Sequence, residues 1–329
     1  MNRNLRLGAL LLDGPVILAP MSGVTDIGMR RIARRFGASL VVTEMVACDT
    51  YLSGQSEAAI RADGQGVAPH VVQIVGCDPT AMGRAARRAE HAGAAVIDIN
   101  MGCPARRVAG GLAGSALMRD LDHALRIVEA VVGAVAVPVT LKMRLGWDES
   151  SVNARQLAIR AEAAGVAMLS VHARTRCQFY NGRADWVAVR AVVEAVGIPV
   201  VVNGDCENAR HARLMLTLSG AQAVMVGRAA IGAPWLAGEI SRALEADAPL
   251  AQPPASARRE AALEHFDALL SLFGSHAGLR HARKHLSAYA EKAGATPAER
   301  LKLVTCDEPG RARQLLAAAF REFDLGVAA

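Results

Sequence analysis

The sequence predicts a TIM (β/α)8 barrel, an α/β fold, followed by a small all-helical C-terminal domain. Short, continuously apolar runs recur about eight times, and alanine-rich amphipathic segments lie between them. Continuously apolar runs are typical of parallel strands that are covered by helices. The length of 329 residues, of which 52% are hydrophobic, suits a barrel-sized domain with an appendage.

The expected strands follow one another in a regular order along the chain. They cover residues 16–19, 40–43, 70–75, 96–99, 139–141, 168–171, 200–202 and 223–226. Helices are expected between them at residues 78–91, 121–135, 152–164 and 207–218, with Gly93 and Gly165 as helix stops. A doubly wound sheet is the alternative fold, but no G-x-G-x-x-G motif follows the first expected strand.

The β-α repeat ends near residue 240, which predicts a barrel domain over residues 1–245. Residues 249–257 are rich in proline and alanine and are expected to form a linker. From residue 256 to residue 329 the chain has only helical periodicity, so this part is predicted to be the helical domain.

Composition narrows the class of protein. The formal net charge of +6 permits a polyanionic partner without requiring one. The six cysteines are scattered and form no C-x-x-C pair, so we expect neither a metal site nor a disulfide framework, and we expect a reducing cytoplasmic setting. The apolar patch at residues 10–12 is too short for a signal peptide, and no apolar run reaches about 18 residues, so no membrane span is expected.

Several expected strands end at polar residues or glycines. In a TIM barrel the C-terminal strand ends form the active site, and the ends of strands seven and eight commonly bind phosphate. Glycines let backbone N–H groups approach a phosphate, and an arginine can pair with it. A site for a phosphorylated planar cofactor is therefore predicted at Gln73, Lys142, His172, Asn203, Gly204, Asp205, Gly227 and Arg228.

Cys103 follows the fourth expected strand in a Gly-Cys-Pro turn, three residues after Asn100. Free cysteines are often buried structural residues, but the turn and the nearby Asn100 favour a chemical role. Lys142 by itself also fits a Schiff-base nucleophile of an aldolase. A loop thiol instead suits the reduction of an activated C=C bond, where it protonates one carbon after a hydride reaches the other.

Several motifs occur together in one order along the chain. They occupy residues 19–26, 98–104, 114–118, 141–144, 172–176, 203–205 and 225–230. On these motifs the sequence resembles the bacterial tRNA-dihydrouridine synthases, most of all their B subtype, over nearly the whole chain. The resemblance implies reduction of a D-loop uridine of tRNA, at position 17 for the B subtype, to 5,6-dihydrouridine. It also implies non-covalently bound FMN as cofactor and NADPH as reductant.

The resemblance assigns roles to individual residues. Hydride passes from N5 of FMN to C6 of the uracil, Cys103 is the catalytic acid that protonates C5, and Asn100 orients the base. Arg174 and Arg176 are expected at the substrate mouth. The cofactor contacts implied are Pro20, Met21, Ser22, Gln73, Lys142, His172, Asn203, Gly204, Asp205, Gly227 and Arg228.

The helical domain carries Arg280, Arg283 and Lys284 at i, i+3 and i+4, on one predicted helix face. Similar residues in the family imply that this face contacts tRNA, whereas a plain solvated helix face is the alternative. Residues 256–329 would then bind tRNA, and residues 1–245 would bind FMN. We expect a monomer.

Two other functions remain open at this point. One is a dihydroorotate-type dehydrogenase, which is also an FMN-dependent barrel enzyme with a loop cysteine. The other is a tRNA-binding regulatory protein without catalysis. Cys103 and Lys142 oppose the second alternative, and the Asn-Met-Gly-Cys-Pro run opposes the first.

Overall fold

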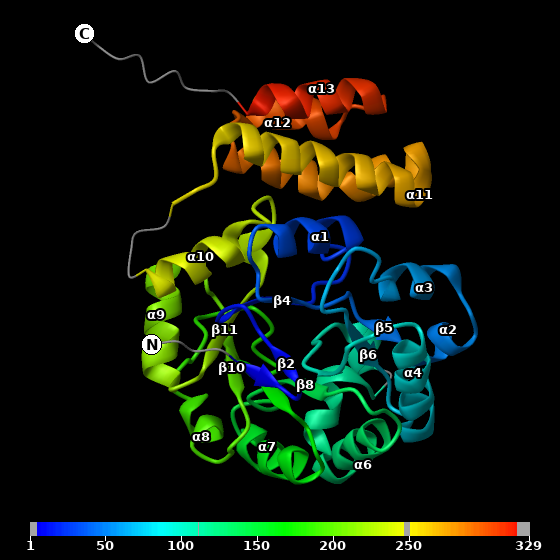
Figure 1. Cartoon of the computed structure of the whole chain (residues 1–329), viewed down its shortest axis with the longest axis vertical. Helices are drawn as coiled ribbons and strands as arrows, with labels where there is room; N and C mark the ends of the chain where they lie inside the picture. The colour runs from blue at the N-terminus through cyan, green and yellow to red at the C-terminus, as the bar shows by residue number, and fades with distance from the viewer. Residues whose placement is uncertain (1–4, 111, 247–250, 321–329) are drawn as a thin grey trace.

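A computed structural model describes residues 5–110, 112–246 and 251–320 of the chain (Figure 1). The end of the predicted helical domain at 321–329 and the predicted linker residues 249 and 250 lie outside the described residues. The described part contains a nine-stranded curled parallel sheet. Its strands are β3 (Val16–Leu18), β4 (Leu40–Val41), β5 (Val46–Ala47), β6 (Val71–Val75), β7 (Val96–Met101), β8 (Val139–Arg144), β9 (Met168–His172), β10 (Val200–Asn203) and β11 (Ala223–Val226).

The sheet closes through the segment between β4 and β5. The strand order is β4-β3-β11-β10-β9-β8-β7-β6-β5, so β4 and β5 stand at its two ends. Val42, just after β4, forms a parallel bridge to Val71 at the start of β6. The backbone N–H of Thr43 donates to the carbonyl of Val71 at 3.2 Å. β4 and β5 are therefore two pieces of one barrel strand, and the predicted eight-fold barrel is confirmed.

Residues along each strand alternate between two hydrophobic cores. Val96 faces the barrel interior, whereas its neighbour Ile97 packs against the surrounding helices. A short antiparallel hairpin of β1 (Arg6–Leu7) and β2 (Leu10–Leu11) adds Leu7 to the interior core. This core includes the first residues of β7 and β9, Val96 and Met168, so the hairpin closes the N-terminal end of the barrel. The opposite end is left for the site.

Helices surround the barrel between the strands. They are α1 (Ile27–Arg35), α2 (Cys48–Leu52), α3 (Ser56–Ala62), α4 (Pro79–His91), α5 (Arg106–Ala109), α6 (Leu121–Val132), α7 (Ala154–Ala163), α8 (Arg190–Val193), α9 (Ala209–Ser219) and α10 (Leu236–Glu245), with 3-10 helices η1 (Gly114–Arg119) and η2 (Arg228–Ala230). The four predicted helices correspond to α4, α6, α7 and α9. Three of them begin at a side chain that accepts a backbone N–H, namely Asp78, Asp120 and Asn208.

The C-terminal part is all-helical, as predicted, and is built from α11 (Ala255–Lys292), α12 (Pro297–Val304) and α13 (Pro309–Ala319). Gly274 interrupts α11 with φ 76° and ψ 166°, a conformation that glycine adopts readily. The chain reverses there. The two halves of α11 pack so closely that a Cβ on Gly278 would lie only 2.6 Å from the carbonyl oxygen of Leu269. α11 is therefore a hairpin of two closely packed helices.

This hairpin joins the helical part to the barrel. Figure 1 shows α11 between the barrel, where it overlies α1, and the pair α12 and α13. Phe266, Leu269 and Leu286 of α11 are buried in one continuous core with the barrel helices. Within the described part of the chain, no helix combines the length and the apolarity that crossing a bilayer requires.

Candidate active site

A cavity of about 760 Å³ opens at the C-terminal ends of the barrel strands. The ends of β3, β8, β9, β10 and β11 all contribute to its wall, as the strand-end prediction requires. Its lining includes Pro20, Met21, Lys142, His172, Asn203, Gly204, Asp205, Gly227 and Arg228, which are nine of the eleven predicted cofactor contacts. The structure brings these nine together; their contact with a cofactor stays a prediction.

Asn203 organises the floor of this cavity. Its Nδ2 donates to the carbonyl of Met225 at 2.9 Å, so Oδ1 faces the cavity. Oδ1 accepts from Nζ of Lys142 and from Nδ1 of His172, each at 3.1 Å. Because Nδ1 of His172 carries the proton, its Nε2 is an acceptor, and Arg174 donates to it at 3.5 Å. The asparagine thus fixes the tautomer of His172 and the position of the Lys142 ammonium.

Burial governs the charge state of both side chains. It lowers the pKa of Lys142 to about 8, with Arg144 adding repulsion. Burial, together with repulsion from Lys142 and Arg144, holds the pKa of His172 well below its usual value. At neutral pH this part of the cavity therefore presents one ammonium and one neutral imidazole.

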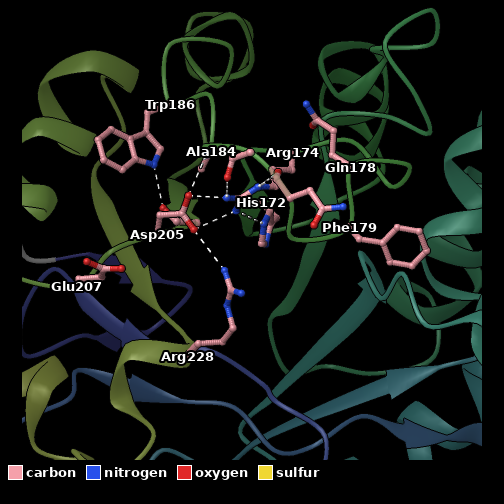
Figure 2. A network of polar contacts seen from close by, with 12 residues as sticks. His172, Arg174, Gln178, Phe179, Ala184, Trp186, Asp205, Glu207 and Arg228 are labelled. Carbon is pink, nitrogen blue, oxygen red and sulfur yellow. Dashed lines mark hydrogen bonds and ion pairs between the residues drawn. The ribbon is translucent and has the colours of Figure 1, made fainter.

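Asp205 and Arg228 also line the cavity. Figure 2 shows both of them with Arg174 in one network of polar contacts. Arg174 donates to both carboxylate oxygens of Asp205, at 3.0 and 2.5 Å, and Arg228 donates at 3.3 Å. The N–H of Ala184 adds a fourth bond at 2.9 Å. Burial opposes the ionisation of Asp205, but these bonds outweigh it and lower its pKa. The two arginines therefore balance the negative charge of Asp205, and Asp205 holds Arg228 in place. The guanidinium carbon of Arg228 lies 4.7 Å from the centre of the Tyr180 ring.

Arg174 and Arg176 have different surroundings, and the contact of either with a substrate stays a prediction. Arg174 is 1% exposed, and besides Asp205 it binds the carbonyls of Asn181 and Gly182. The planar guanidinium of Arg174 offers five N–H donors, and carbonyl and carboxylate oxygens around it accept from them. These bonds hold the β9–α8 loop in place. Arg176 is half-buried and lies 4.7 Å from the ring of Trp147 and 4.5 Å from that of Phe179.

Cys103 sits at the rim of the same strand ends, held by its backbone. Its N–H donates to Oδ1 of Asn100 at 2.9 Å. Its carbonyl accepts from Oγ of Ser115 at 2.7 Å and from the Ser115 N–H at 3.1 Å. In the strand register Asn100 is paired with Lys142, which places the thiol loop beside the cavity.

Gln73 and Ser22 lie outside the main cavity. The amide of Gln73 accepts from Nδ2 of Asn100 at 2.7 Å and donates to Asp98 at 2.6 Å. Ser22 lines a second cavity of about 460 Å³, which Val108 and Ala113 of the Cys103 loop also line. Neither residue lines the main cavity, and the contact of each with a cofactor stays a prediction.

The three predicted basic residues of α11 have different surroundings. Arg283 pairs with Asp307 at 2.6 Å, whereas Nζ of Lys284 would lie 2.9 Å from a Cβ on Gly23 in the barrel. Arg280 is exposed. The contact of these three residues with tRNA stays a prediction. Lys292, which the sequence analysis did not single out, lines the main cavity from the end of α11.

One buried cluster escaped the sequence analysis. Asp26 caps α1 and accepts from Nε2 of His265 at 3.0 Å, while His265 Nδ1 bonds the hydroxyl of Tyr289 at 2.9 Å. Nε2 of His285 lies 3.8 Å from Asp26. Among the described residues, Asp26, His265 and His285 are the one group with three ligand atoms close enough to hold a metal ion. The expectation of no metal stays a prediction.

Comparison with known proteins identifies related sequences over almost the full length. A family model described as dihydrouridine synthase matches residues 17–324. A protein of Rhodobacter capsulatus named "Probable tRNA-dihydrouridine synthase" is 51% identical over 96% of this chain and 98% of its own. A protein of Xanthomonas campestris named "tRNA-dihydrouridine synthase B" is 44% identical over 87% of each chain.

Solved structures share the barrel at low sequence identity. An old yellow enzyme homologue of Zymomonas mobilis is 15% identical, with a TM-score of 0.53, and covers 78% of this chain and 95% of that one. A 2-naphthoyl-CoA reductase is 11% identical, with a TM-score of 0.58, over 75% of this chain and 52% of its own. At such identities the likeness bears on the fold alone.

Proposed function

The chain belongs to the dihydrouridine synthase family, and from this premise we propose that it reduces a D-loop uridine of tRNA to 5,6-dihydrouridine. The observation that carries the proposal is the shared rim of β7 and β8. Asn100 and Lys142 are register partners there, so the anchored backbone of Cys103 follows the strand next to the one that carries Lys142 into the cavity. Reduction of a C=C bond needs a hydride donor and a proton donor that are held close to the same substrate.

The residues of the cavity fit FMN. Lys142 is a partly buried cation that suits the polar edge of a flavin, and Arg228 is a second cation of the cavity lining that suits its phosphate. Gly227 also lines the cavity, and a Cβ there would meet its nearest neighbours only at 3.9 Å, so the backbone leaves room for a ligand. When bound, FMN would supply the hydride for C6 of the uracil after NADPH has reduced it.

Cys103 would supply the proton. Its S–H donates to C5 as the hydride arrives at C6, so the C5=C6 bond gains one hydrogen at each carbon. The thiolate left behind regains a proton from solvent. Asn100 and Ser115 hold the backbone on both sides of the thiol, which limits its movement relative to the cavity.

The substrate uridine must leave its stack to reach the barrel mouth. We propose that the helical domain binds the tRNA backbone through exposed cations, with Arg280 and Lys284 contributing most directly. Lys284 is close to Gly23 of the barrel, so its contact with RNA would lie beside the cavity. The proposed target is position 17, which the resemblance to the B subtype implies; two relatives carry the name "tRNA-dihydrouridine synthase B".

The six cysteines are all free, which suits the reducing cytoplasm that we propose as the place of action. A monomeric state stays a prediction, which light scattering of the purified protein tests. Identity to tRNA-dihydrouridine synthases over 96% of the chain argues against a dihydroorotate dehydrogenase. The Cys103 and Lys142 geometry argues against a regulatory protein without catalysis.

Mapping of dihydrouridine in cellular tRNA, with and without this gene, tests the function. Loss of one D-loop dihydrouridine, at position 17, and its restoration by the intact gene are the expected results. An unchanged map would overturn the proposal. Purified protein should also be yellow, and flavin absorption bands that stay absent after FMN is added would contradict the cofactor assignment.

A further inference from the structure

Asp98 is a buried carboxylate for which the proposed reaction has no use. It lies in the middle of β7 between Ile97 and Ile99 and is 4% exposed. One oxygen accepts from Oγ1 of Thr140 at 2.5 Å, and the other accepts from Nε2 of Gln73 at 2.6 Å. The positive charge of Lys142 favours the ionised form of Asp98 and lowers its pKa, although the two side chains form no direct ion pair.

A chain of hydrogen bonds leads from Asp98 to the thiol loop. Gln73 donates to Asp98 through Nε2, and its Oε1 accepts from Nδ2 of Asn100 at 2.7 Å. Oδ1 of Asn100 then accepts from the backbone N–H groups of Gly102, at 3.1 Å, and Cys103, at 2.9 Å. Each of the two amide side chains in this series of hydrogen bonds could, in isolation, have its oxygen and its NH₂ group exchanged.

The two ends remove that freedom. An ionised carboxylate only accepts hydrogen bonds, so Gln73 must turn its NH₂ group toward Asp98 and its oxygen toward Asn100. Asn100 must then donate to Gln73, which leaves its oxygen for the backbone of the thiol loop. Backbone N–H groups only donate, so the far end requires the same orientation. Both ends therefore specify one arrangement of the two amides.

We propose that Asp98 is a positioning residue, which orients Gln73 and Asn100 and thereby holds the backbone of Cys103 in place. This inference rests on the proposed function only in taking Cys103 as the proton donor. Burial raises the pKa of Asp98 to about 6, so the carboxylate is retained against a cost. A hydrophobic residue at this position would avoid that cost, but it would leave Nε2 of Gln73 without its acceptor.

The role requires a hydrogen-bond acceptor at position 98 that orients Gln73, and it does not require the negative charge of Asp98. An asparagine at position 98 could still accept from Gln73 through its oxygen and donate its NH₂ to Oγ1 of Thr140. Asp98→Asn should therefore rescue the role, whereas Asp98→Leu, which has neither acceptor, should lose it. Thr140→Val is the matched control, because Asp98 keeps its bond to Gln73 in that variant.

The test uses the full-length, flavin-loaded protein and two measurements. The first is the alkylation rate of Cys103 by iodoacetamide relative to that of the exposed Cys177, read by peptide mass spectrometry. The second is kcat and KM for dihydrouridine formation in tRNA. Asp98→Leu should raise the Cys103 to Cys177 ratio at least about threefold and lower kcat by on the order of tenfold, with KM for tRNA unchanged, because small misplacements are costly. Asp98→Asn and Thr140→Val should stay within about twofold of the wild type on both measurements, since their amide orientation is kept.

Either of two results would overturn the inference. One is an Asp98→Leu protein with unchanged alkylation ratio and kcat, and the other is an Asp98→Asn protein as impaired as Asp98→Leu. Should Asp98→Leu fail to fold, Gln73→Met cuts the next link and should raise the alkylation ratio in the same way. Cys103→Ala separates the two proposals, since turnover by that variant would refute the acid role of Cys103 while leaving the alkylation result to decide on Asp98.

Discussion

The carboxylate of Asp26 and the imidazole of His265 lie 3.0 Å apart, although 238 residues separate them along the chain. Asp26 belongs to the barrel, at the end of the loop that carries Pro20 and Met21, and His265 belongs to α11. The bond therefore ties the docking of the helical domain to a wall of the main cavity. Tyr289 and His285 complete the cluster.

The cluster should make domain docking sensitive to acid. Burial lowers the pKa of His285 to about 3, with repulsion from His265 adding to it. The unfolded chain binds a proton at this histidine below about pH 6.5 and the folded chain does not, so stability falls as the pH drops from about 6.5 toward 3. His265 and His285 outweigh the burial of Asp26 and lower its pKa as well, which adds a loss in the same direction at the acid end.

Thermal unfolding of the wild type and of His285→Gln between pH 7 and 4.5 measures this effect. The wild type should lose up to about 1.4 kcal/mol more per pH unit than the variant, whatever the offset between them at pH 7. Parallel curves for the two proteins would show that His285 titrates as it does in the unfolded chain.

Replacement of Cys103 separates cofactor chemistry from substrate chemistry. Cys103→Ala should keep bound FMN and the oxidation of NADPH, because the thiol does not line the main cavity. Dihydrouridine formation should fall about 10²–10⁴-fold, the usual contribution of general acid catalysis. Cys103→Ser should resemble the alanine variant, because a hydroxyl is a much weaker acid. A rate near that of the wild type with alanine would assign the proton to another group.

Arg228 should recognise the phosphate of FMN. Titration of flavin-free protein with FMN and with riboflavin, followed by fluorescence, distinguishes this role from contact with the ring. Arg228→Ala should weaken FMN binding at least about tenfold and leave riboflavin binding unchanged, because only FMN offers an anion for a charge-assisted bond. Asp205→Asn should show the same selectivity to a lesser degree, since it frees the guanidinium that Asp205 holds. Equal losses for both flavins would contradict the assignment.

Charge reversal on α11 should weaken tRNA binding. Arg280→Glu and Lys284→Glu should each lower the affinity and reduce the slope of log K against log salt by about one, because each removes one phosphate contact. Arg155→Glu on α7 is the matched control, since Arg155 is also exposed but lies on a barrel helix. Filter binding at several salt concentrations measures both quantities. A loss of tRNA affinity of the same size in the control would show that the effect comes from the net charge of the protein alone.

The strands and the strand-end site could be predicted because their signals are local. Buried parallel strands such as β10 are continuous apolar runs, and the residues that end them, such as Asn203, meet at one rim in any barrel of this kind. The division of one strand into β4 and β5 was not predicted, since Val42 pairs across the closure and Glu44 and Met45 then leave the sheet. The reversal of α11 at Gly274 has only a single glycine as its signal.

The partners of the site residues could not be predicted, because they depend on tertiary contacts. Nothing near Arg174 in the sequence indicates that its guanidinium turns inward to Asp205. The bond from Asp26 to His265 has no local signal in either segment. Asp98 does have one, a charged residue in an otherwise apolar run, and it could have been singled out as a buried carboxylate in need of donors.

Both peptide groups of Cys103 are fixed by residues outside the segment that follows it, through Asn100 on one side and Ser115 on the other. The backbone of Cys103 is therefore held by contacts that do not depend on the sequence of residues 105–110. Under the proposed function, substitutions in this segment should therefore leave both backbone anchors of the proton donor in place. For protein engineering, the same segment can be exchanged without removing either anchor.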